Sequence, residues 1–94
     1  MKEKEMIKRL EDAIVPLGAT LLEFDYSRKY FGNMIVKIRD SSHRLHEFVL
    51  DRGVIEIGSV SMPVRIEGRV KSESEVFDAF LQAIVQDLAV LRSR

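Results

Sequence analysis

Apolar and polar residues alternate almost without interruption between residues 21 and 60, and this alternation constrains the fold more than any other feature. A period of two places successive side chains on opposite faces of a β-strand. Turn-forming residues, among them Gly32, Asn33 and Gly53, divide the segment into strands of hairpin length. The segment therefore predicts an antiparallel meander with one apolar face and one charged face.

The positions of the apolar residues constrain the first two turns. Directly opposed residues of an antiparallel pair lie on the same face of the sheet. The first three strands carry their inward side chains at even positions, beginning with Leu22, Phe24 and Tyr26. Each of the first two turns must then contain an odd number of residues, and we expect three-residue turns at 31–33 and 41–43.

The later turns are expected to be shorter. The fourth strand carries its inward side chains at odd positions, Ile55 and Ile57, which requires an even turn at 52–53. A further two-residue turn at 58–59 leads into a segment in which Pro63 removes a backbone donor. That segment is expected to be an edge strand or an extended loop, so the sequence favours four strands over five.

This register predicts which outward side chains are neighbours across the strands. The expected pairs are Asp25 with Arg39, Lys37 with Glu47, and Ile35 with Val49. Two pairs join opposite charges and the third joins two apolar residues, which are combinations that stabilise a sheet.

A helix is expected on each side of the meander. Residues 2–17 carry apolar side chains at helical spacing, namely Ile7, Leu10, Ile14 and Leu17, and Gly18 is a suitable end. Residues 72–91 carry a wider apolar stripe, and Ser72 and Glu75 have the spacing of a capping box. The chain is therefore expected to be a single α+β domain, residues 1–94. Its architecture would be a two-layer sandwich with an N-terminal helix, a four- or five-stranded antiparallel meander and a C-terminal helix.

Composition excludes several classes of protein. The 94 residues include no cysteine, so disulfides and thiolate chemistry are absent. A small secreted domain without disulfides is unusual, and the charged N-terminus lacks a signal core, which favours a cytoplasmic location. No apolar run reaches the roughly 20 residues of a membrane span. Fifteen basic and fifteen acidic residues give a formal net charge of zero, which does not favour nucleic acid.

The sequence contains no pattern typical of a catalytic, cofactor or metal site. Asp40, His43, His46 and Glu47 are close in sequence, but their spacing matches no ligand motif, and alternation places His46 inward and His43 in a turn. The glycines are scattered among turns and form no phosphate loop. We therefore expect a protein that is not an enzyme and that binds neither metal nor cofactor.

The outward face of the meander is the first candidate site. Ile35, Leu45 and Val49 would form an apolar cluster there, framed by charged side chains. The framing residues are Lys37, Arg39 and Glu47. The cluster predicts a protein-binding module, which either associates with itself as a dimer or binds a distinct partner.

The tip of the first hairpin is the alternative site. Arg28 and Lys29 stand beside Tyr30 and Phe31, a combination of cations and aromatic rings suited to stacking on bases. This motif predicts an RNA- or ribosome-associated protein. The competing interpretation is that these aromatic residues pack against the end of the sheet.

Two short motifs carry a resemblance to known proteins. The runs 30–33, Tyr-Phe-Gly-Asn, and 48–53, Phe-Val-Leu-Asp-Arg-Gly, resemble a pattern of small uncharacterised bacterial proteins of an immunity-protein-like kind. That resemblance implies a cytoplasmic binding protein without catalysis. The leading helix and first hairpin are also similar to the N-terminal domain of the bacterial ribosome maturation factor family, although this likeness ends after the second strand.

Overall fold

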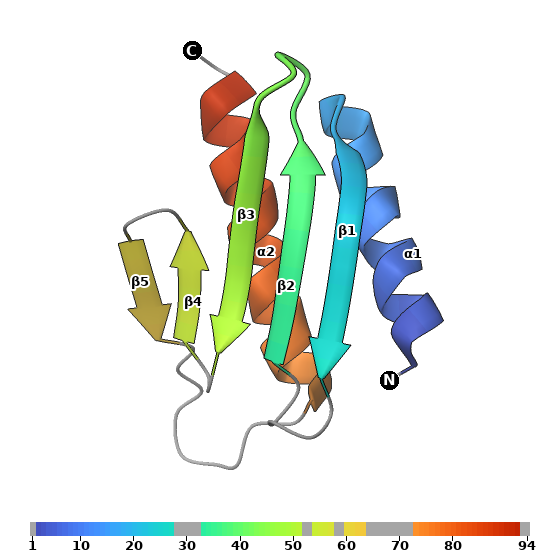
Figure 1. Cartoon of the computed structure of the whole chain (residues 1–94), viewed down its shortest axis with the longest axis vertical. Helices are drawn as coiled ribbons and strands as arrows, with labels where there is room; N and C mark the ends of the chain where they lie inside the picture. Colours follow the sequence, from blue (N-terminus) through green and yellow to red (C-terminus); the bar gives the residue numbers. More distant parts are fainter. Residues whose placement is uncertain (1, 28–32, 52–53, 58–59, 64–72, 93–94) are drawn as a thin grey trace.

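The chain folds into two layers, an antiparallel sheet and a pair of helices that cover one of its faces (Figure 1). The computed structural model describes residues 2–27, 33–51, 54–57, 60–63 and 73–92. In chain order the elements are α1 (Glu3–Ile14), the 3-10 turn η1 (Val15–Leu17), β1 (Thr20–Ser27), β2 (Asn33–Arg39), β3 (Leu45–Asp51), β4 (Val54–Ile57), β5 (Val60–Pro63) and α2 (Glu73–Arg92). This confirms the predicted α+β sandwich, but the preference for four strands was wrong, because residues 60–63 pair with β4 as a fifth strand.

The two layers share one apolar core. From α1 come Met6, Leu10 and Ile14, which are four residues apart and therefore lie on one side of the helix. The predicted stripe differs at one position, because Met6 is buried and Ile7 is only half-buried. The sheet and α2 contribute the other large buried side chains: Met34, Val36, Ile38, Phe48, Leu50, Ile55, Phe77, Phe80, Ile84 and Leu88.

A polar contact joins the two helices at the edge of this core. The guanidinium of Arg9 on α1 lies 5.1 Å from the ring centroid of Phe77 on α2. The same guanidinium forms an ion pair with Asp78. A cation above an aromatic face and an ion pair both favour this position of the arginine, so they align α1 with α2.

The strands from β2 to β5 have the predicted register. Lys37 pairs with Glu47 and Ile35 pairs with Val49, as expected. Val54 on β4 pairs with Asp51 on one side and with Pro63 on the other. Pro63 therefore lies on the edge strand, where a missing donor costs least. The predicted turns at 52–53 and 58–59 and the capping residue Ser72 lie outside the described residues.

The predicted register of β1 is wrong. Asp25 pairs with Ile35, and Arg39 pairs with Thr20, so Asp25 and Arg39 are not neighbours. Asn33, expected in the turn, is the first residue of β2 and pairs with Ser27. The requirement for an odd number of residues in this turn did not prevent the error, because the sequence has five residues between the two strands and five is also odd.

A β-bulge explains a second difference in β1. The register shifts between Leu21 and Glu23, so that Leu21 pairs with Ile38 and Glu23 pairs with Lys37. The extra residue is Leu22, which is 44% exposed instead of facing the core. Leu21 packs against the core in its place. A bulge at an edge strand also hinders pairing with another sheet.

Candidate interaction surface

Both helices lie on one side of the sheet, and the other side is left uncovered by the described elements (Figure 1). We call this uncovered side the open face. Its outward side chains come from alternate positions of β1 to β4, and the cross-strand pairing of these strands places them on one face. They are Thr20, Glu23, Asp25, Ser27, Asn33, Ile35, Lys37, Arg39, Leu45, Glu47, Val49, Asp51, Val54 and Glu56.

The three apolar residues predicted to cluster on the open face are not all adjacent. Ile35 and Val49 are direct cross-strand neighbours. Leu45 is four residues from Val49 on the same strand, which corresponds to about 13 Å. Leu45 pairs instead with Arg39 and is 72% exposed. The open face therefore holds the pair Ile35–Val49 and the half-buried Val54 at one end, and a single exposed leucine at the other.

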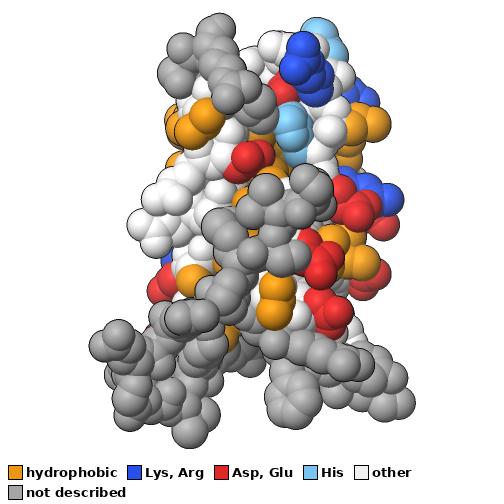
Figure 2. Space-filling model, turned by 90° about the vertical axis from the view of Figure 1, so that its left-hand side faces the viewer, with side chains coloured by type: hydrophobic (Ala, Val, Ile, Leu, Met, Phe, Trp, Pro, Cys, Tyr) orange, Lys and Arg blue, Asp and Glu red, His pale blue; other side chains and the backbone are white. Residues whose placement is uncertain are grey.

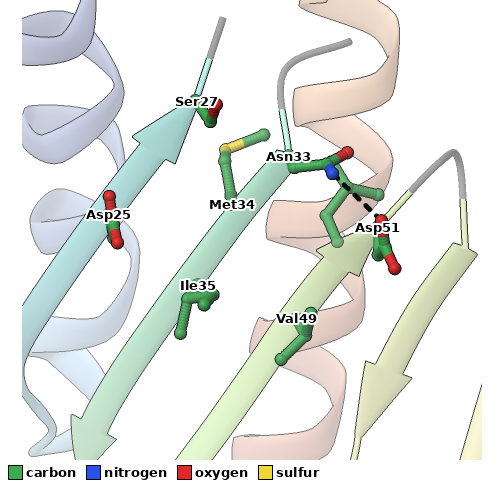
Figure 3. Close-up of a pocket in the computed structure, with 8 residues that line it drawn as sticks. Asp25, Ser27, Asn33, Met34, Ile35, Val49 and Asp51 are labelled. Atoms are coloured by element: carbon green, nitrogen blue, oxygen red, sulfur yellow. Dashed lines mark hydrogen bonds between the residues drawn. The ribbon is translucent and has the colours of Figure 1, made fainter. Parts of the chain in front are cut away.

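A shallow pocket of about 240 Å³ lies at the end with the apolar pair. Figure 3 shows Asp25 and Ser27 on β1, Asn33 and Ile35 on β2, and Val49 and Asp51 on β3 around it, and the buried Met34 and Leu50 also line it. The amide nitrogen of Asn33 donates a hydrogen bond of 3.0 Å to Asp51 Oδ1. The volume falls below the roughly 300–1,000 Å³ of small-molecule sites, so the pocket suits a protruding side chain better than a cofactor.

Carboxylates surround this pocket. Asp25 and Asp51 line it, and Glu56 is the cross-strand neighbour of Val49. Among the described residues no ion pair neutralises Asp25 or Glu56. Figure 2 shows acidic side chains gathered along its right-hand side, where the open face is seen edge-on. We call Asp25, Ile35, Val49, Asp51 and Glu56 together the acidic end.

A paired row of charges separates the acidic end from the other end of the open face. Lys37 Nζ lies 3.3 Å from Glu23 Oε2 and 3.9 Å from Glu47 Oε2. These side chains are about half exposed, so the pairs contribute little stability, on the order of 0–1 kcal/mol each. Beyond this row lie Arg39 and Leu45, which we call the basic end.

The predicted partner-binding residues therefore belong to three parts of one surface. Ile35 and Val49 lie at the acidic end, Lys37 and Glu47 in the middle row, and Arg39 and Leu45 at the basic end. Sequence reasoning missed the carboxylates of Asp51 and Glu56 as site residues. Their signal was the same alternation, since both occupy outward positions beside Val49.

Asp40 and His46 form a compact polar cluster at the turn between β2 and β3. His46 Nε2 donates to Asp40 Oδ2 at 2.7 Å, and the ring stacks on Phe48 with centroids 6.2 Å apart. Asp40 Oδ1 accepts from the backbone amides of Ser42 and Arg44. The hydrogen bond from His46, followed by that from the Arg44 amide, lowers the pKa of Asp40 from 3.8 to about 2. Two bonds of this carboxylate close the turn and the third holds His46 on β3, which indicates a structural role.

The remaining expectations concern His43, metal binding, a membrane span and the predicted RNA-binding residues. His43 is exposed in the turn and has a φ of 65°, as its predicted position in a turn suggested. Within the described ranges, no group of three His, Cys, Asp or Glu side chains is arranged to hold a metal. No helix in that part of the chain is long and apolar enough to cross a membrane. Arg28, Lys29, Tyr30 and Phe31, the predicted RNA-binding residues, lie outside the described residues.

Comparisons of the chain with protein-family models, curated proteins and solved structures give no match. The resemblance to immunity-type bacterial proteins therefore stays a prediction. Any functional conclusion must come from the open face and its chemistry.

Proposed function

We propose that this protein is a non-catalytic protein-binding module and that the open face of its sheet is the binding surface. The observation that carries the proposal is the shallow pocket at the acidic end, where Ile35 and Val49 lie between the carboxylates of Asp25 and Asp51. Apolar area framed by charge is typical of surfaces that bind proteins with moderate affinity. The absence of cysteine supports a cytoplasmic location for such a module.

The charges near the first hairpin favour a protein partner over RNA. Asp25 and Asp51 lie close to the described ends of β1 and β3, and Asp25 precedes the first predicted RNA-binding residue, Arg28, by three positions in the sequence. Carboxylates repel a phosphate backbone, and phosphate contacts supply most of the affinity of nonspecific nucleic-acid binding. The alternative of RNA association is therefore kept as an outcome of the experiment below.

The test is recovery of associated protein from native lysate by the tagged chain, with and without nuclease, beside light scattering of the purified protein. Leu45→Asp with Val49→Lys is expected to abolish specific recovery or self-association, because it places charge at both apolar sites of the open face. Nuclease treatment is expected to leave recovery by the wild type unchanged.

The matched control changes two exposed apolar residues outside the sheet. Val15→Asp with Val90→Lys introduces the same charges at side chains that are 63% and 54% exposed. The control is expected to recover the same proteins as the wild type. If both variants behave like the wild type while keeping its thermal stability, the open face is not the binding surface. Recovery that nuclease abolishes would support RNA association instead.

A further inference from the structure

The two ends of the open face have complementary chemistry. The acidic end offers carboxylates around an apolar floor, and no described cation is paired with Asp25 or Glu56 there. The basic end offers Arg39, which forms no ion pair with a described residue. Its cross-strand neighbour Leu45 is the most exposed large apolar side chain among the described residues. The acidic end can therefore bind a cation that has an aliphatic neighbour, and the basic end of the same surface presents such a cation.

The strand register places the two ends symmetrically. The pairs Arg39–Leu45 and Ile35–Val49 lie two residues to either side of the pair Lys37–Glu47. At about 3.3–3.4 Å per residue, each is about 7 Å from the central pair. A two-fold axis that runs across the strands above the Lys37–Glu47 pair therefore superposes one end of a first copy on the opposite end of a second. The same axis places the row of Glu23, Lys37 and Glu47 opposite the same row of the second copy, where each lysine keeps the ion pairs of its own chain.

We infer that the open face binds a second copy of this chain, packed face to face with its strands antiparallel to those of the first. In this arrangement Arg39 of one copy lies above Ile35 of the other and beside its Asp25. Leu45 of one copy covers Val49 of the other. Within a single chain Asp25 and Arg39 are separated by the central row. The pairing therefore exists only between copies, and two-fold symmetry forms it twice.

General properties of sheets support this packing. Two sheets stack face to face about 10 Å apart with their strands nearly aligned. The seven-residue strands β2 and β3 make the face about 23 Å long, and its five strands make it about 19 Å wide, although β4 and β5 are only four residues long. A patch of that size falls below the roughly 800 Å² per partner of a standard interface, so the dimer is expected to be weak and concentration-dependent.

The inference rests on the proposed function and names the partner. The test is sedimentation velocity of the purified chain from low micromolar to near millimolar concentration. The wild type is expected to shift from monomer to dimer over this range. Arg39→Glu and Asp25→Lys are each expected to raise the dimer dissociation constant by about tenfold or more, since each places like charges together twice. The double variant, with both charges exchanged, is expected to recover most of the association.

Lys8→Glu is the matched control, because it makes the same kind of charge reversal on an exposed residue of α1. It is expected to dimerise like the wild type. A wild type that stays monomeric throughout overturns the inference, and so does a dimer that both single variants leave unchanged. Failure of the double variant to recover overturns the pairing of Arg39 with Asp25. A monomer that still loses a lysate partner through Leu45→Asp with Val49→Lys overturns this inference alone and leaves the proposed function standing.

Discussion

Gly18 lies close to the turn between β2 and β3, and Asp40 closes that turn. Gly18 follows η1 with a φ of 75°, a left-handed conformation that glycine adopts without strain. A Cβ at this position would lie 3.0 Å from the Cβ of Ser41 in the turn. Asp40 closes the same turn through the amides of Ser42 and Arg44.

Gly18→Ala is expected to lower the free energy of unfolding by about 1–2 kcal/mol, because it adds both a strained φ and a close contact. Urea denaturation of the two proteins measures the difference. Adding Ser41→Gly should restore part of the loss by removing the contact while leaving the backbone strain. A Gly18→Ala protein as stable as the wild type would show that the close approach to Ser41 is absent.

Asp40 makes the stability of the fold depend on pH in the acidic range. Its pKa is about 2 in the folded chain and 3.8 for an unperturbed aspartate, so the ionised carboxylate stabilises the folded state. This contribution is fully present above 3.8 and is lost as the pH falls toward 2. Asp40→Asn should therefore lower the melting temperature at neutral pH, and its difference from the wild type should shrink as pH falls through that window.

Thermal unfolding followed by circular dichroism across this pH range tests the expectation. Asp12→Asn, which removes an exposed carboxylate of α1, serves as the control for loss of charge alone. A difference between wild type and Asp40→Asn that stays constant down to the lowest pH would contradict the assigned role of Asp40.

At the scale of the elements, β1 decides which residues reach the core and which reach the open face. Its bulge turns Leu21 toward the core and leaves Leu22 exposed. Its register with β2 brings Asp25 beside Ile35, which completes the acidic end. A regular strand with simple alternation would have buried Leu22.

Leu21→Ala is expected to cost about 2 kcal/mol of unfolding free energy, whereas Leu22→Ala is expected to cost about 0.5 kcal/mol. The reason is that only Leu21 packs against the core. Denaturant titration of both variants gives the comparison directly. A larger loss for Leu22→Ala would mean that the strand has no bulge.

The sequence predicted most of the sheet, and the exceptions have physical reasons. The register from β2 to β5 followed from alternation combined with short turns. The inward face of each strand and the number of residues in each turn together allow only one pairing of the strands. Between β1 and β2, turns of three and five residues keep the same faces, so alternation could not choose between them. Nothing in the adjacent leucines 21 and 22 shows which one is inserted by the bulge. The apolar pair Ile35–Val49 was predictable for the same reason as the register, and the position of Asp25 beside it was not.

At the scale of the whole molecule, the distribution of charge matters more than its total. The formal net charge is zero, yet five carboxylates and two cations point outward from the described part of the open face. The carboxylates of Asp25, Asp51 and Glu56 lie at one end and Arg39 at the other. A surface with this polarity favours an oriented partner, because only one orientation brings a cation of the partner to the acidic end and a carboxylate of the partner to Arg39.

Methyl NMR of the isotope-labelled wild type tests the central claim that the open face is the binding surface. Spectra would be recorded at low concentration, at high concentration, and at low concentration in unlabelled native lysate. We predict that the methyl signals of Ile35, Leu45 and Val49 shift or broaden at high concentration or in lysate, while those of Val15 and Val90 stay unchanged. Changes confined to Val15 and Val90, or no change at Ile35, Leu45 and Val49 under either condition, would contradict the account.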